Sequence, residues 1–92
     1  MNPQMVNVFG KVYKITYIDM DDDGECHNEK ALIEINKKLF GKDLLHTLLH
    51  EYFHAVIYRL SIDRVISDDV EELICDTFAT FIVDNKVFNT KE

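Results

Sequence analysis

Two histidines four residues apart, with a glutamate directly after the first, are the part of this sequence best suited to chemistry. They occur in the string His50-Glu51-Tyr52-Phe53-His54, which matches the pattern HExxH. Four residues make slightly more than one helical turn, so on a helix both imidazoles project from one face and can bind one metal ion. Zinc–nitrogen distances of about 2.0–2.1 Å are compatible with that spacing. The motif therefore predicts a zinc site with His50 and His54 as ligands.

Glu51 occupies the position that a general base requires. It is offset around the helix from the two histidines, so its carboxylate can reach a water on the metal without being a ligand itself. Zinc lowers the pKa of such a water, and Glu51 would take its proton and pass it to a leaving amine. We therefore expect a zinc metallopeptidase that hydrolyses a peptide bond by a zinc-activated water, with Glu51 as the catalytic residue.

A catalytic zinc ion normally has three protein ligands and keeps one position open for water. A later segment offers Glu71, Glu72, Cys75 and Asp76. Glu72 and Asp76 are four residues apart and share a helix face, so we expect Glu72 to be the third ligand, with Glu71 and Cys75 as the alternatives. Asp76 could accept a hydrogen bond from the second ring nitrogen of a ligating histidine and fix its orientation.

Two helices are expected to hold these residues. Apolar residues around HExxH recur every three or four positions and predict a deeply buried helix, with Asp43 as its N-cap; they are Leu44, Leu45, Leu48, Leu49, Tyr52, Phe53, Val56, Ile57 and Leu60. Ser67 or Asp68 can cap a second helix that ends near Asn85. Its expected apolar face consists of Val70, Ile74, Phe78, Phe81 and Ile82.

The segment before the helices has the composition of β-strands. Residues 6–17 alternate and are rich in β-branched and aromatic side chains, with a break expected at Gly10. Residues 19–24 form an acidic turn, and residues 30–36 form a second strand that we expect to pair with the first as a hairpin. The sequence thus predicts an α+β fold, a small hairpin or sheet packed on two zinc-binding helices, in one domain over residues 1–92.

Composition limits the classes of partner. The chain has 92 residues and a formal net charge of −7, which argues against a nucleic-acid surface. It contains no long apolar run and no signal-peptide pattern, so we expect no membrane association and a cytoplasmic location. The expected partner is a protein or peptide substrate, and a further protein partner is compatible with the many apolar residues.

The motifs resemble those of a known family. The segments TLLHEYFHA and EELICDTFATFIV are similar to the two zinc-binding helices of the ImmA/IrrE-type metallopeptidases and of small phage proteins related to them. The similarity spans roughly residues 44–83 and includes the glutamate-zincin pattern Glu72-x-x-x-Asp76-x-Phe78-Ala79. The resemblance implies that His50, His54 and Glu72 bind zinc, that Glu51 is the catalytic base and that Asp76 supports a ligand.

The main alternative is a catalytically degenerate zinc-binding protein with a regulatory or interaction role. The short chain has no clear equivalent of the extra His or Tyr that stabilises the oxyanion in larger thermolysin-like enzymes. Structural zinc sites are closed by four protein ligands, so a fourth ligand such as Cys75 would favour this alternative.

Overall fold

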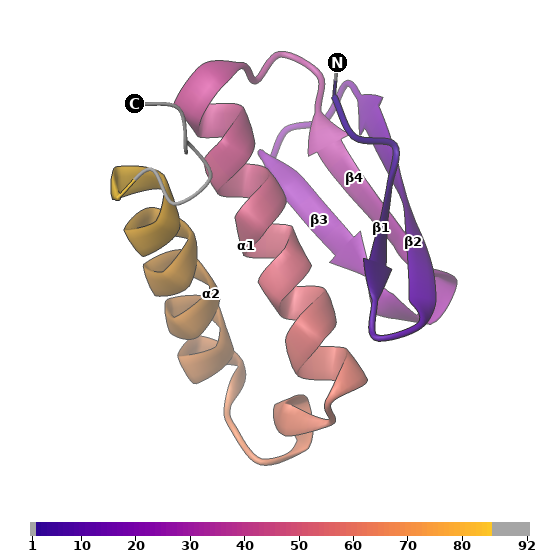
Figure 1. Ribbon diagram of the computed structural model, residues 1–92, viewed down its shortest axis with the longest axis vertical. Coiled ribbons are helices and arrows are strands. Elements are labelled where there is room, and N and C mark those ends of the chain that lie inside the picture. The colour runs from indigo at the N-terminus through magenta and orange to yellow at the C-terminus, as the bar shows by residue number, and fades with distance from the viewer. Residues whose placement is uncertain (1, 86–92) are drawn as a thin grey trace.

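The computed structural model describes residues 2–85 and has an α+β architecture, which confirms the predicted fold class. Four strands form one sheet, and two long helices follow them in the chain (Figure 1). The elements are β1 (Met5–Val8), β2 (Lys11–Ile18), β3 (Gly24–His27), β4 (Leu32–Asn36), α1 (Gly41–Arg59) and α2 (Asp68–Asp84), with short 3-10 helices at Asn28–Lys30 and Ile62–Arg64.

The sheet has the strand order β1-β2-β4-β3. β1 and β2 form an antiparallel hairpin in which Val8 pairs with Lys11, and the two-residue turn between them has positive φ at Phe9 and Gly10. Positive φ at both central residues is the geometry of the tight turns that suit twisted hairpins, and glycine adopts it at low cost. The break predicted at Gly10 is therefore confirmed.

The predicted hairpin between residues 6–17 and 30–36 is wrong. β2 and β4 are parallel neighbours, with Ile15 beside Ile33, and the antiparallel partner of β4 is β3. The predicted acidic turn, residues 19–24, ends at Gly24, where β3 begins as a short edge strand. Its four residues lack a clear apolar alternation, so the pattern did not distinguish it from a turn. The turn from β3 to β4 places Ala31 in the left-handed region, and β4 starts at Leu32.

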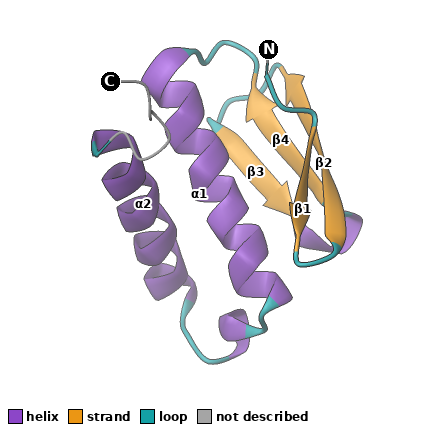
Figure 2. Cartoon of the chain, viewed as in Figure 1, coloured by secondary structure: helices purple, strands orange, loops and turns teal. Residues whose placement is uncertain are grey.

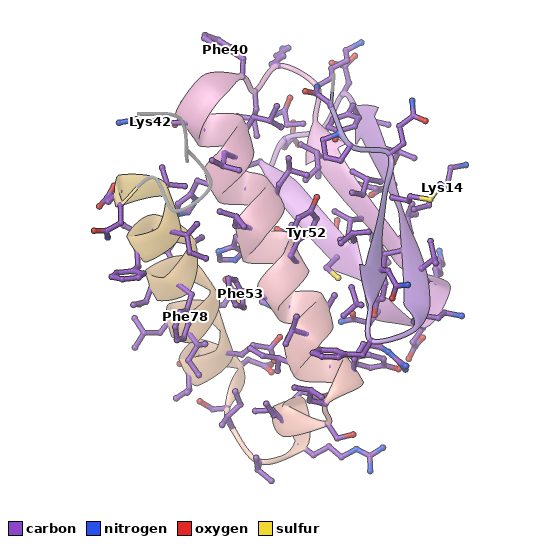
Figure 3. All side chains as sticks on the ribbon, viewed as in Figure 1. Lys14, Phe40, Lys42, Tyr52, Phe53 and Phe78 are labelled. Carbon is purple, nitrogen blue, oxygen red and sulfur yellow. The ribbon has the colours of Figure 1, made fainter. Side chains whose placement is uncertain are left out.

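α1 lies between the sheet and α2, as the ribbon views show (Figure 2). The core forms where one sheet face meets this helix, and it includes Tyr13, Ile15, Ile33, Ile35 and Leu48. Tyr52 extends from α1 on the side of the sheet and packs against this cluster (Figure 3). Because α1 is covered on two sides, the long apolar run around HExxH is explained by its central position.

The ends of α1 differ from the prediction. The helix begins at Gly41 with Phe40 as its N-cap and no side-chain cap, so Asp43 lies in the first turn and is not the cap. Asp43 still places a negative charge near the helix N-terminus, where the dipole favours it. Leu60 follows the last helical residue and is exposed, because the chain turns away from the core there.

α2 starts as predicted, with the Ser67 side chain accepting a hydrogen bond from the Val70 amide. Its apolar face was predicted only in part: Ile74 and Ile82 are half-buried, but Val70, Phe78 and Phe81 are 42%, 49% and 59% exposed. The buried residues of α2 are Cys75 and Ala79, whose small side chains let the helix approach α1 closely. Phe78 instead stacks on Phe53 of α1, with ring centroids 5.4 Å apart (Figure 3).

Within residues 2–85, neither helix combines the length and the apolar character needed to cross a membrane.

Candidate metal centre

The structure brings the three predicted ligands together. His50 and His54 lie one turn apart on α1, and their Nε2 atoms are 3.2 Å from each other. Glu72, on the facing side of α2, places Oε1 3.1 Å from Nε2 of His50 and Oε2 3.0 Å from Nε2 of His54. Two imidazole nitrogens and one carboxylate, from two helices, therefore converge on one point.

These spacings fit a tetrahedral metal site. With metal–ligand bonds of about 2.0–2.1 Å, the ligand atoms at the corners of a tetrahedron are separated by about 3.3 Å. The two Nε2 atoms are 3.2 Å apart, close to that value, and each lies 3.0–3.1 Å from a different oxygen of Glu72. Two imidazoles and a carboxylate are also a donor set found in catalytic zinc sites, so both geometry and chemistry fit zinc.

Glu71 fixes the protonation of His54. Its Oε2 atom lies 2.6 Å from Nδ1 of that histidine, and an ionised carboxylate can only accept a hydrogen bond. Nδ1 therefore carries a proton, and in the neutral ring Nε2 directs its lone pair at the carboxylate of Glu72. Two acceptors facing each other at 3.0 Å repel unless a cation or proton lies between them. The hydrogen bond thus prepares Nε2 to bind a metal.

His50 has weaker support from the residue predicted to orient it. Asp76 Oδ1 is 3.9 Å from Nδ1 of His50, which is too long for a direct hydrogen bond, and 3.4 Å from Nε2 of His46. Burial lowers the pKa of His50, with His54 acting in the same direction and Glu72 opposing it. A lowered pKa favours the neutral imidazole, which is the form that binds metal.

Glu51 lies on the buried side of the motif. Only 6% of its surface is exposed, and a Cβ atom on Gly24 of β3 would lie 3.2 Å from Glu51 Oε2 and 2.8 Å from Thr47 Cγ2. The missing side chain at Gly24 therefore lets the edge strand close over the carboxylate. Burial raises the pKa of Glu51 to about 7, and the negative charges of Glu72 and Glu25 act in the same direction.

A cavity of about 310 Å³ opens onto the cluster. It is bounded by α1, α2 and β3, and its walls include all three predicted ligands, His50, His54 and Glu72, together with Glu51. Because Glu51 and the ligand atoms line the same cavity, a water molecule and a peptide carbonyl in it could contact both Glu51 and a metal ion held by the ligands. That arrangement can support hydrolysis by general-base catalysis.

The two alternative third ligands occupy other positions. Glu71 contacts the outer nitrogen of His54, so it supports a ligand. Cys75 is fully buried and is absent from the cavity wall, and burial raises the pKa of its thiol to about 12. A protonated thiol is a poor metal ligand, because binding requires the thiolate.

Sequence reasoning missed two features of this site. Glu71 was predicted as an alternative metal ligand. In the structure Glu71 contacts Nδ1 of His54, and Glu72 contacts Nε2 of the same histidine. Gly24 was predicted only as a turn residue. No local pattern identifies that glycine as the contact between β3 and Glu51, because the contact joins residues distant in the sequence.

Comparisons of the chain with family models, with curated proteins and with solved structures find no match. The assignment of a function to this site therefore depends on its own geometry, together with the motif resemblance described above.

Proposed function

We propose that this protein is a zinc-dependent metallopeptidase in which His50, His54 and Glu72 hold the metal and Glu51 is the general base. One observation carries the proposal. Two imidazole nitrogens and the carboxylate of Glu72 converge in a cavity whose wall also contains a buried carboxylate. A structural zinc site would need a fourth protein ligand, and the described residues group only these three around the point.

Bound zinc would supply a Lewis acid that polarises a peptide carbonyl and lowers the pKa of a coordinated water. The other steps belong to side chains of this chain. Glu51 accepts a proton from the attacking water and delivers it to the amine that leaves. Glu71 holds His54 in the tautomer that presents Nε2 to the metal. β3 covers Glu51 and limits its contact with bulk water, which raises the pKa of this carboxyl in the metal-free protein.

The test combines metal content with cleavage. Protein expressed without added metal is analysed by plasma mass spectrometry and then incubated with a peptide library, whose cleavage products are identified by mass spectrometry. We expect about one zinc per chain and defined cleavage sites. Glu51→Gln should keep the zinc and slow cleavage by about 10²–10⁴-fold, the usual contribution of a general base.

Glu29→Gln is the matched control, because Glu29 is an exposed residue outside the cavity and its loss makes the same change in charge. It should cleave at the wild-type rate. A Glu51→Gln protein that cleaves as fast as wild type would overturn the assignment of the base. One zinc per chain without cleavage of any peptide would favour the zinc-binding interaction protein instead.

A further inference from the structure

A second cavity, of about 210 Å³, adjoins the metal centre. It shares Gly24, His50 and Glu51 with the first cavity, so the two spaces meet at the residues proposed to act in catalysis. A peptide whose scissile bond lies at the metal would therefore place a neighbouring side chain in this second cavity. The residues that line only the second cavity, and not the first, determine which side chain it accepts.

Two carboxylates face this cavity from different elements. Asp76 projects from α2, and Asp23 lies directly before β3. Both side chains belong to exposed residues, so neither is consumed by the core. Within residues 2–85, the only ionic contacts of Asp76 are to His46 at 3.4 Å and to His50 at 3.9 Å, and Asp23 makes none. Both can therefore pair with a charge brought by a ligand.

The elements around the two cavities carry almost no positive charge. β3 and α2 contain no Lys or Arg, and on α1 these residues stand only at the two ends, as Lys42 and Arg59. None of the described Lys or Arg residues lines either cavity. Five acidic residues besides Glu51 line them, and a divalent metal would offset two of these charges. The cleft thus remains negative with the metal bound and attracts cations.

We propose that the second cavity is a subsite for a Lys or Arg side chain next to the scissile bond, with Asp23 and Asp76 as its recognition carboxylates. This inference rests on the proposed peptidase function. It names the substrate class as peptides with a cationic residue beside the cleaved bond. Acidic residues at that position are repelled by both carboxylates, so the same two side chains provide attraction and exclusion.

Binding of peptide hydroxamates to the zinc-containing protein tests the proposal without requiring turnover. The hydroxamate group chelates the metal through its open positions, and the adjacent residue is Lys, norleucine or Glu. Two series place that residue on either side of the hydroxamate, and calorimetry gives the dissociation constants. In one series we expect the Lys compound to bind roughly tenfold more tightly than the norleucine compound. The Glu compound should bind more weakly than both. High salt should reduce the difference.

Asp23→Asn should retain binding of the norleucine compound and reduce the Lys preference to about threefold, because one of two carboxylates is lost. Asp21→Asn is the matched control, since Asp21 lies in the same acidic loop and outside the cavity. It should keep the full preference. Asp76 is unsuitable as the test position, because it also lies 3.9 Å from Nδ1 of His50.

The two proposals fail differently. If norleucine binds but Lys shows no advantage in either series, the subsite is overturned and the peptidase function stands. If Asp21→Asn lowers the preference as much as Asp23→Asn, the effect comes from overall charge and the subsite is again overturned. If no hydroxamate binds a protein that holds one zinc per chain, the metal has no open position and both proposals fall.

Discussion

Two clusters in this molecule bring histidine and glutamate side chains close enough to hold a metal ion. One is the centre formed by His50, His54 and Glu72. The other, which we call the outer cluster, consists of Glu25 and His27 on β3 and Glu34 on β4. In each cluster the ligand atoms lie within 4.8 Å of one another. Proximity of suitable atoms therefore does not separate them.

The clusters differ in how their geometry is maintained. In the outer cluster, Glu25 and Glu34 are direct neighbours across β3 and β4, and His27 Nε2 lies 2.9 Å from Glu34 and 3.8 Å from Glu25. A histidine between two facing carboxylates relieves their repulsion, which explains the arrangement without a metal. Among residues 2–85, no hydrogen bond reaches Nδ1 of His27, whereas Nδ1 of His54 is held by Glu71.

The surroundings also differ. Glu34 lies on the sheet face that points away from α1, as its alternation with the buried Ile33 and Ile35 requires, and Glu25, its neighbour on β3, borders the edge of the cavity. The metal centre has a cavity, a buried carboxylate and a fixed histidine tautomer. Supporting contacts, more than ligand distances, therefore distinguish the proposed metal centre from the outer cluster.

The largest contrast is expected from removing one histidine of each cluster. His54→Ala leaves two protein ligands at the metal centre and should weaken zinc binding by more than about a hundredfold, beyond the usual effect of a supporting residue. His27→Ala should leave the zinc affinity unchanged. Competition with a chromophoric chelator measures both. Loss of zinc binding in His27→Ala would show that the outer cluster is the principal metal site.

Glu51 predicts a pH dependence of stability in the metal-free protein. Its pKa of about 7 lies above its ordinary value of 4.5, so between these pH values the folded chain holds a proton that the unfolded chain has released. The free energy of unfolding is therefore highest below pH 4.5 for this group and falls as the pH rises through 7, by roughly 3 kcal/mol.

Urea unfolding of EDTA-treated protein at pH 5 and pH 8 measures this loss. His50 acts in the opposite direction, because its lowered pKa makes the neutral, higher-pH form the favoured one. The difference between wild type and Glu51→Gln isolates the glutamate, and Glu34→Gln in the outer cluster is the control that should keep the wild-type slope. An unchanged slope in Glu51→Gln would contradict the burial of this carboxylate.

A smaller effect is expected from the supporting glutamate. Glu71→Ala removes the hydrogen bond to Nδ1 of His54 and should weaken zinc binding by about 10–100-fold without removing a ligand. Glu34→Ala removes the corresponding contact of His27 and should not change zinc affinity. The same chelator competition applies, with circular dichroism to verify folding. Equal affinities for Glu71→Ala and wild type would remove the contrast between the clusters.

Much of the fold could be predicted from local patterns. The helical period around HExxH identified α1, and Ser67 identified the start of α2, because periodicity and capping depend on nearby residues. The order of the strands could not be predicted in this way. β3 has only four residues, and its pairing with β4 places β2 and β4 in parallel through contacts between distant segments.

The buried face of α2 could not be predicted from the sequence either. Phe78 and Phe81 are large and apolar, so their spacing suggested a core face, whereas the buried residues of α2 are Cys75 and Ala79. Helix packing selects the face that allows close approach, and small residues can provide it better than large ones. The hydrophobicity of the side chains alone therefore does not predict which face of α2 packs against α1.

The pairing of His50 with His54 follows from the sequence alone, because four residues on one helix fix the relative positions of the two side chains. The roles of Glu71 and Glu72 depend on the tertiary structure. Adjacent residues on a helix are rotated by about 100°, so the orientation of α2 against α1 selects which carboxylate meets both Nε2 atoms and which meets Nδ1. The enclosure of Glu51 was likewise decided by the approach of β3 at Gly24, since that contact depends on packing between segments far apart in the chain.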